Sequence, residues 1–299
     1  GILYFPKINI EFESAEGVIK LYNNQVFVAD NIKEVIPEFL MLLKGVIDCP
    51  DLPLNVSRSA LQNDGFVKKI SDYITKKVAD KLSGMCKTDK ESYEKYWDDI
   101  SPFIKFGCLK DDKFCEKMND YILFKNLDGK YLTLPECLEE NKEKHENTVF
   151  YVKDEIEQGQ YIKMFKDQGM DAVILKHNID QPFITHLEQK NENLKFLSID
   201  SDLSEIFKDD ADDSEEAKEA LKADNDKLSE IFKKALGKDN LQVKAEKLKD
   251  AEVSSMITIN EDSKRMADMM KMYGMSGMDP EMYGAQGETL VLNLNNVLV

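Results

Sequence analysis

The stretch LYNNQVFVADNIKEVIPEFLMLLKGVIDCPDLPLNVSRSALQND, residues 21–64, holds the patterns that decide the fold class. Its first part is rich in β-branched and aromatic residues, and Asn23-Asn24 marks a hairpin turn or a bulge. The following IPEFLMLLKG places Pro37 where a first helical turn tolerates proline and Gly45 where a helix C-terminus favours glycine. The stretch therefore predicts paired strands followed by a helix.

Further along, apolar residues recur at three-to-four spacing and predict an amphipathic helix that stops at Gly84: Phe66, Ile70, Tyr73, Ile74, Val78 and Leu82. Helical patterns with many aromatic residues continue through about residue 122 and predict a small helical connector. TVFYVKD, DAVILKH and LKFLSID then alternate with short helical segments, which predicts a small, mostly parallel sheet with helices packed on it. None of these strands is followed by a glycine-rich phosphate loop, so the sequence offers little support for nucleotide binding there.

The acidic segment 209–227 is expected to be a solvated linker or helix face, and only secondarily an interaction site. Beyond it, a capped helix, two strand-like segments and another helix predict a separate domain that begins near residue 204. We therefore predict an α/β and α+β multi-domain chain with units at 1–85, 86–122, 123–203 and 204–299. These are a layered αβα unit, the connector, a smaller αβα unit and an α+β domain.

Composition excludes several classes of function. The 299 residues carry a formal net charge of −17, whereas a nucleic-acid-binding surface needs clustered lysine and arginine. Apolar runs such as EFLMLLKGVI are far shorter than the ~20 residues that span a bilayer. The five cysteines have no CxxC spacing, and the three histidines lie in separate elements without ligand spacing, so we expect a reducing compartment and no metal site.

Strand-like segments lie at both ends of the sequence. GILYFPK resembles a strand that begins midway, and ETLVLNLNNVLV stops just after another strand-like segment without a polar tail. We expect a fragment whose two ends are cut within folded structure.

Arg58 is one of only two arginines among the 40 basic residues. Pro50 and Pro53 stiffen the loop before it, and a helical turn starting near Ser57 would project Arg58 and Gln62 from one face at i and i+4. A guanidinium is a planar fork suited to phosphate oxygens, which is the geometry of an arginine finger. From spacing alone, an exposed ion pair with a nearby aspartate is the alternative.

Methionines form the second unusual feature, because seven of the 13 fall between Met266 and Met282. A helix would bring Met266, Met269, Met270 and Tyr273 into one stripe at i, i+3, i+4 and i+7. Core packing is the ordinary meaning of such a stripe. Contact with many apolar partners is the alternative, since methionine side chains are flexible and polarizable.

Residues 21–64 closely resemble the middle domain of the ninety-kilodalton heat-shock chaperone family, which are dimeric ATP-dependent chaperones. The resemblance is carried in order by VF, IPEFL, KGVID, DLPLNVSR and LQ. It continues through TVFYVKD and DAVILKHNID to LVLNLNN and so covers essentially the whole chain. By this resemblance, residues 1–85 are the later part of the large middle-domain unit, and 204–299 are a C-terminal domain without its final dimerisation helices.

The resemblance implies roles for the two unusual features. In the family, the arginine of NVSR contacts the terminal phosphate of an ATP held in a separate N-terminal domain, with the glutamine four residues later assisting. These positions are Arg58 and Gln62. An exposed helix in the family's C-terminal domain touches unfolded clients, and its position matches residues 262–273, which include Met266, Met269, Met270 and Tyr273.

The resemblance also implies what the chain would do alone. The N-terminal ATPase domain would be absent, so the fragment would not hydrolyse ATP, whereas the intact protein would be an ATPase using ATP and Mg²⁺. The dimerising helices would lie after Val299. We expect a cytoplasmic, bacterial member that acts in protein folding under stress, and neither nucleic acid nor membrane as a partner.

The sequence leaves two other functions open. A nucleotide-independent scaffold could use the methionine region to grip one fixed partner helix. A self-contained enzyme at 148–200 is disfavoured, because no phosphate loop or cluster of acid, base and nucleophile is present in that sequence.

Overall fold

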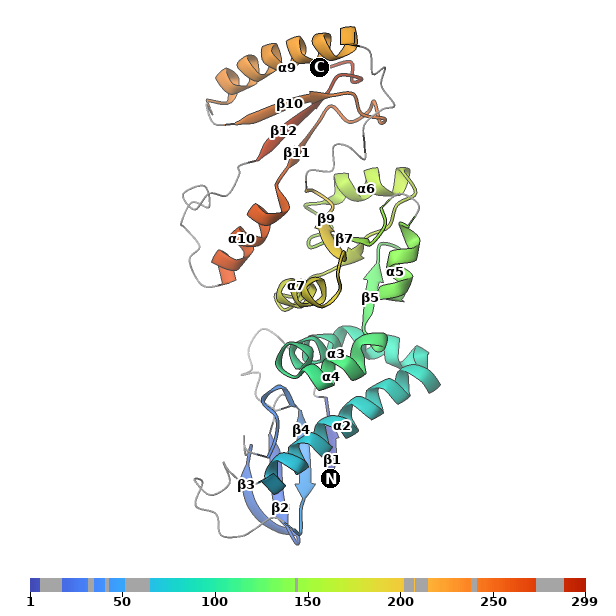
Figure 1. Ribbon diagram of the computed structural model, residues 1–299, viewed down its shortest axis with the longest axis vertical. Coiled ribbons are helices and arrows are strands. Elements are labelled where there is room, and N and C mark those ends of the chain that lie inside the picture. The colour runs from blue at the N-terminus through green and yellow to red at the C-terminus, as the bar shows by residue number, and fades with distance from the viewer. Residues whose placement is uncertain are drawn as a thin grey trace. The chain divides into compact units, whose positions relative to one another are not determined.

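The computed structural model describes ten parts of the chain: residues 1–5, 18–31, 35–40, 43–51, 65–142, 145–201, 207, 215–237, 241–272 and 288–299. They form two compact units, which we describe separately (Figure 1). Unit 1 comprises Gly1–Lys125, Gly129–Cys137 and Ile179–Glu192. Unit 2 comprises Asn126–Asp128, Leu138–Asn178 and Asn193–Val299.

Unit 1 begins with a mixed four-stranded sheet in the order β1-β4-β2-β3. Its strands are β1 (Ile2–Tyr4), β2 (Ile19–Asn23), β3 (Val26–Asp30) and β4 (Lys44–Asp48). Strands β2 and β3 form the predicted hairpin, while β4 runs parallel to β2 and antiparallel to β1. The turn is centred on Asn24 and Gln25, both with positive φ, one residue later than the sequence predicts.

The prediction of a helix that ends at Gly45 is wrong. Among the described residues of this stretch, Glu38–Leu40 form a 3-10 turn, η1, and Gly45 lies in strand β4 at φ +150° instead of ending a helix. The reason is a close approach of two backbones, because a Cβ on Gly45 would lie 2.0 Å from the carbonyl oxygen of Ile2. Glycine is needed here for strand pairing.

Several helices follow this sheet in unit 1: α2 (Gly65–Thr88), α3 (Lys90–Lys110), α4 (Asp112–Met118), the 3-10 turn η2 (Asn119–Tyr121) and α7 (Asp180–Lys190). The prediction that α2 stops at Gly84 is wrong, since the helix continues to Thr88. Packing of α2 against α3 and α4 outweighs the local preference of one glycine. Strands β5 (Leu123–Asn126) and β6 (Tyr131–Thr133) form an antiparallel hairpin, and α5 (Leu134–Glu140) follows it.

Unit 2 contains the expected alternation of strands and helices. Strand β7 (Thr148–Val152) pairs in parallel with β8 (Val173–Ile174) and with β9 (Lys195–Ser198), and α6 (Gly159–Asp167) connects β7 to β8. The prediction of a mostly parallel arrangement is therefore confirmed for these strands.

The later part of unit 2 is an α+β layer. Strands β10 (Gln242–Glu246), β12 (Thr289–Asn293) and β11 (Ser255–Thr258) pair in that order, the first two in parallel. Helix α9 (Glu215–Leu236) packs on β10, where Asn225 Oδ1 accepts a hydrogen bond of 2.6 Å from Ala245 N. Residues 215–227 of the acidic segment are thus helical, and one of them docks this helix.

One apolar cluster joins the two parts of unit 2. It includes Phe150, Phe165 and Phe207 with residues of the later layer such as Leu248, Met256 and Val291. Helix α10 (Glu261–Met272) belongs to the same unit. The α/β and α+β multi-domain fold class is confirmed.

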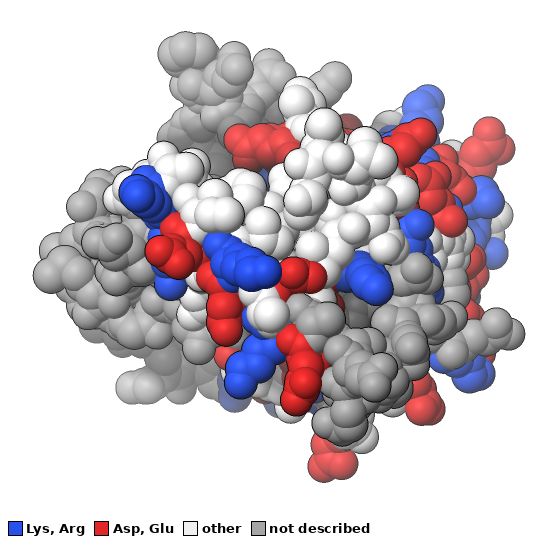
Figure 2. All heavy atoms as spheres, turned by 90° about the horizontal axis from the view of Figure 1, so that it is seen from above, with Lys and Arg blue, Asp and Glu red and all other residues white. Residues whose placement is uncertain are grey.

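No helix in the described part of the chain combines the length and apolarity that crossing a bilayer requires. On the face shown in Figure 2, basic and acidic side chains of the described residues are interspersed.

Candidate functional site

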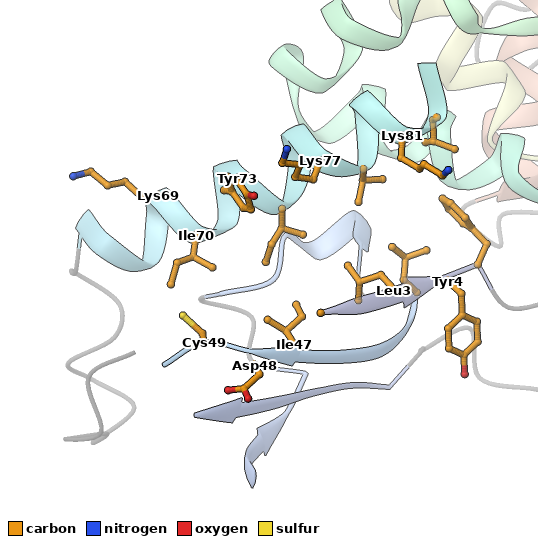
Figure 3. Close-up of a pocket in the computed structure, with 16 residues that line it drawn as sticks. Leu3, Tyr4, Ile47, Asp48, Cys49, Lys69, Ile70, Tyr73, Lys77 and Lys81 are labelled. Carbon is orange, nitrogen blue, oxygen red and sulfur yellow. The ribbon is translucent and has the colours of Figure 1, made fainter. Parts of the chain in front are cut away.

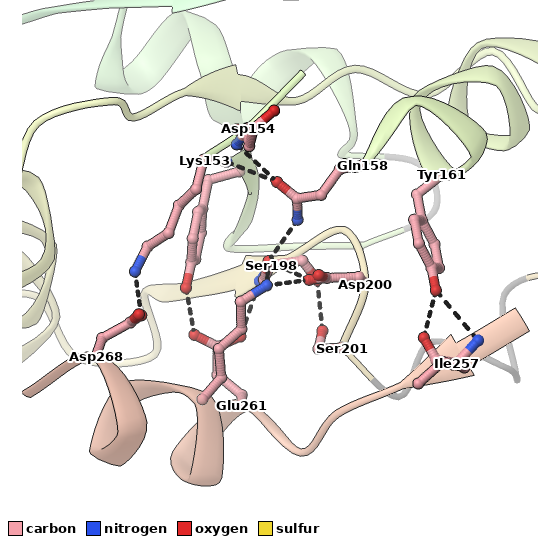
Figure 4. A network of polar contacts seen from close by, with 12 residues as sticks. Lys153, Asp154, Gln158, Tyr161, Ser198, Asp200, Ser201, Ile257, Glu261 and Asp268 are labelled. Carbon is pink, nitrogen blue, oxygen red and sulfur yellow. Dashed lines mark hydrogen bonds and ion pairs between the residues drawn. The ribbon is translucent and has the colours of Figure 1, made fainter. Parts of the chain in front are cut away.

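Helix α10 turns a polar face toward β7 and β9 of its own unit (Figure 4). Four charged side chains form this face at i, i+3, i+4 and i+7: Glu261, Lys264, Arg265 and Asp268. Each makes a hydrogen bond or ion pair to the rest of unit 2. The face that a surface helix normally turns to solvent is here turned inward.

Glu261 is the centre of these contacts. Its Oε1 accepts hydrogen bonds from the Tyr151 hydroxyl at 2.8 Å and from Arg265 Nε at 2.9 Å. Its Oε2 accepts a hydrogen bond of 2.9 Å from the backbone nitrogen of Ser198. Burial first, and then the charge of Glu261, raise the pKa of Tyr151, so the phenol stays protonated and remains a donor. One carboxylate thus fixes the start of α10 to two strands.

Lys264 makes the second anchor. Its ammonium pairs with Asp200 and donates a hydrogen bond of 2.8 Å to Ser198 Oγ, which in turn donates to Asp200 Oδ1 at 2.5 Å. Burial opposes ionisation of Asp200, but the charge and hydrogen bond of Lys264 and the Ser198 hydroxyl outweigh it. The pKa of Asp200 therefore lies below its usual value. Gln158 Nε2 extends the network by donating to Ser198 Oγ at 3.2 Å.

Two more contacts hold the rest of the helix. Arg265 donates a hydrogen bond of 2.7 Å from a terminal nitrogen to the carbonyl oxygen of Phe196 in β9, and Lys153 pairs with Asp268 one turn further on. Since all four polar residues of this face are engaged, they hold α10 by directional contacts. Apolar burial is not needed on this side.

The methionines lie on a different face. At 100° per residue, Met266, Met269 and Met270 centre roughly 140° from the polar anchor face. Met269 is 54% exposed, and Met266 and Met270 are half-buried. Helix α10 therefore exposes Met269, while Glu261, Lys264, Arg265 and Asp268 face the rest of unit 2.

The second candidate site is the segment that carries Arg58. Arg58 and Gln62 lie outside the described residues, as does Tyr273, but the residues that lead into this segment from β4 are described. Cys49 N donates to the Tyr22 carbonyl oxygen at 2.9 Å, and Asn23 Nδ2 donates to the Pro50 carbonyl oxygen at 3.2 Å. The end of β2 therefore holds the chain where it leaves β4.

A cavity of about 670 Å³ lies between α2 and the strands β1 and β4, next to Asp48 and Cys49 at the end of β4 (Figure 3). Its walls are mainly apolar, with Leu3 and Ile47 on the sheet side and Ile70 on the helix side, and Asp48 lies at its margin. No three histidine, cysteine or carboxylate side chains converge on a common metal position anywhere in the described residues.

Comparison with known proteins decides the family. The Hsp90 protein family model matches residues 1–299. The chain belongs to the Hsp90 family. It is 38% identical over 310 residues to the chaperone protein HtpG of Bacteroides fragilis and 37% identical over 314 residues to that of Porphyromonas gingivalis. Each alignment covers 100% of this chain and 44% of the relative, so the chain spans less than half the length of these curated relatives.

More distant bacterial members agree with this assignment. The chaperone protein HtpG of Idiomarina loihiensis is 30% identical over 287 residues, which are 92% of this chain and 45% of that protein. The Hsp90 resemblance of residues 21–64 therefore extends to a match over the whole sequence, and the family recognition is confirmed.

In this Hsp90-family chain, the structure brings Met266, Met269 and Met270 onto one helix, whereas Arg58 and Gln62 stay outside the described residues. The sequence does not reveal which residues orient the methionine helix, above all Glu261 and Arg265. Their i, i+4 spacing is visible, but their partners in β7 and β9 are more than 60 residues away in sequence.

Proposed function

We propose that this chain is the middle and C-terminal portion of an ATP-dependent chaperone. We propose further that α10 contacts partly folded client proteins through Met266, Met269 and Met270, together with Tyr273, which follows the helix in sequence. The observation that carries the proposal is the orientation of α10. Its charged face is engaged within unit 2, and Met269, which lies outside that face, is 54% exposed. Family membership and the chaperone names of the relatives support it.

Methionine suits this role for a physical reason. Its unbranched, polarizable side chain can adapt to apolar partners of different shape, which favours many clients over one. Since Glu261, Lys264 and Arg265 hold the backbone of α10, this adaptability lies in the side chains, and the helix itself remains a firm platform.

The test is a titration of the protein with several unrelated unfolded proteins, comparing wild type with Met266→Ser/Met269→Ser/Met270→Ser. We expect the affinity for every client to fall by about tenfold or more, because three apolar contacts are lost. A tenfold loss corresponds to about 1.4 kcal/mol of binding free energy. Leu236→Ser is the matched control. Leu236 lies on α9 in the same unit and is also 54% exposed, so its loss should leave client affinity unchanged.

The same titration separates the proposal from a nucleotide-independent scaffold. Saturable binding of a single partner, lost in the triple variant while other clients are ignored, would favour a scaffold that grips one helix. Equal losses in the triple variant and in Leu236→Ser would mean that α10 is not the contact.

The proposal extends to the loop at 52–64. In the intact protein, Arg58 reaches the terminal phosphate of ATP held with Mg²⁺ by an N-terminal domain, and Gln62 assists. A guanidinium placed where phosphoryl charge develops lowers the barrier electrostatically. The fixed exit from β4 supports it, because hydrogen bonds at Cys49 and Pro50 reduce the freedom that the loop loses when it docks. The intact protein acts as a homodimer in the cytoplasm.

ATP turnover of the full-length protein tests this part. Arg58→Ala should lower kcat by one or more orders of magnitude, and Arg58→Lys should recover only part of it because an ammonium lacks the planar fork. A wild-type rate in Arg58→Ala would remove this residue from the mechanism while leaving the α10 proposal intact.

A further inference from the structure

Two buried cysteines and a histidine meet within unit 1, away from both candidate sites. Cys108 lies near the end of α3, Cys115 lies in α4, and His186 lies in α7. Cys115 Sγ is 3.8 Å from His186 Nε2, and a hydrogen bond between the Cys108 and Cys115 thiols shifts the pKa of both. Cys108 is 1% exposed and Cys115 is 3% exposed. A thiol pair with an adjacent base differs from isolated core cysteines.

The sequence between the two cysteines builds this contact. Asp111 ends α3 and caps α4, because its Oδ1 accepts a hydrogen bond of 2.9 Å from Phe114 N while its carbonyl accepts one of 2.9 Å from Cys115 N. Gly107 lets the two helices approach, since a Cβ there would lie 2.7 Å from the Phe114 ring. The tight turn and the glycine together bring the end of α3 and the start of α4 close together at the two cysteines.

The charges around Cys115 distinguish the two thiols. The hydrogen bond from Cys108 lowers the pKa of Cys115 to about 6 against the opposing effect of burial, with further help from His186 and the charge of Lys190. The hydrogen bond with Cys115 and burial raise the pKa of Cys108. Lys190 is itself held over this site by a 2.6 Å ion pair with Asp112. Cys115 is therefore the more readily ionised thiol of the pair, and Cys108 is its hydrogen-bonded neighbour.

We propose that Cys115 and Cys108 form a peroxide-sensitive dithiol site that closes reversibly to a disulfide between α3 and α4. The Cys115 thiolate attacks one oxygen of hydrogen peroxide, the O–O bond breaks, and the departing hydroxide takes a proton to leave as water. Cys115 becomes a sulfenic acid. The Cys108 sulfur then attacks this sulfenic sulfur, the S–O bond breaks, and the Cys108 proton leaves with the hydroxyl as a second water. Two thiols are oxidised and one peroxide is reduced.

Cys86 supplies an internal comparison. It lies on α2 in the same unit, is half-buried and therefore more accessible than Cys115, and burial raises its pKa. Accessibility alone predicts that Cys86 reacts first, whereas the proposal predicts that Cys115 does. The larger thiolate fraction of Cys115 outweighs its lower intrinsic nucleophilicity by about threefold or more at pH 7.

The experiment titrates the folded chain with hydrogen peroxide at pH 7 and locates oxidised cysteines by differential alkylation and mass spectrometry. In the wild type, Cys108 and Cys115 should lose their thiols together, before Cys86, and recover them with dithiothreitol. Cys108→Ser should accumulate a dimedone-reactive sulfenic acid at Cys115. Cys115→Ser should leave Cys108 no more reactive than Cys86, and circular dichroism checks that both variants are folded.

Three results would overturn the proposal: oxidation of Cys86 ahead of the pair, a dimedone adduct on Cys108, or reaction of the pair only in urea. Should either serine variant fail to fold, the alkylation rate of wild-type Cys115 against pH decides instead. The proposal expects this rate to level off above about pH 6. A rate that keeps rising through pH 8 would contradict it.

Discussion

At the scale of single residues, backbone geometry explains positions that side-chain pattern misassigns. The pattern around Gly45 predicts a helix end, but this residue lies in β4, where the chain of β1 passes so close that no Cβ fits. The sequence shows only that a glycine is present. Which of its two uses applies, a helix end or a close strand contact, depends on a strand more than 40 residues earlier.

Gly45→Ala should therefore lower the free energy of unfolding by about 2 kcal/mol or more, because φ of +150° and the Ile2 carbonyl both oppose a side chain. Urea denaturation measures the change. Gly84→Ala is the control, since this glycine lies inside α2 and a Cβ there would meet no heavy atom within 4 Å. It should instead stabilise the protein by about 0.5–1 kcal/mol.

Ionisation of Asp200 should contribute to the free energy of unfolding. Its folded pKa is lowered, with burial opposed by Lys264 and Ser198, so its contribution is present above the unfolded pKa of about 3.9 and is lost as pH falls through the folded pKa. Asp200→Asn should cost about 1–3 kcal/mol at pH 7. The difference from wild type should shrink as the pH of the urea denaturation is lowered below about 4. A difference that does not change with pH would exclude this ionisation as its source.

At the scale of elements, α10 combines a predictable helix with an unpredictable orientation. The sequence EDSKRMADMMKMYG predicts a helix and the structure has one at Glu261–Met272, because its periodicity is local. Which face points inward is not predictable in this way. The usual rule buries the apolar stripe, and here polar partners in β7 and β9 reverse that rule.

Removing the central carboxylate should loosen this element selectively. Glu261→Ala deletes acceptors for Tyr151, Ser198 and Arg265. The amides of α10 should therefore exchange with deuterium about tenfold faster, which corresponds to a free energy of local opening lower by about 1.4 kcal/mol. Asp262→Ala, which changes a neighbouring carboxylate outside the anchor face, is the matched control and should leave exchange near wild type. Equal acceleration in both variants would mean that the network does not hold the helix.

At the scale of the whole molecule, the sequence predicts the fold class and the family, and both are confirmed. Strand and helix patterns are local, and a 38% identical relative aligns along the full chain. The predicted boundaries at 85, 122 and 203 remain predictions. The structure groups residues into two units and assigns Ile179–Glu192 to unit 1, because long-range packing, which local pattern does not encode, decides which elements associate.

The central claim is that the outward face of α10 meets client proteins. Site-specific photo-crosslinking tests it most directly, with a photoreactive amino acid in place of Met269 on α10 or, as the control, in place of Ile231, which is 59% exposed on α9. Incubation with an unfolded client should give crosslinks at position 269 well above those at 231, and excess unlabelled client should abolish them. Equal crosslinking at the two positions would contradict the account.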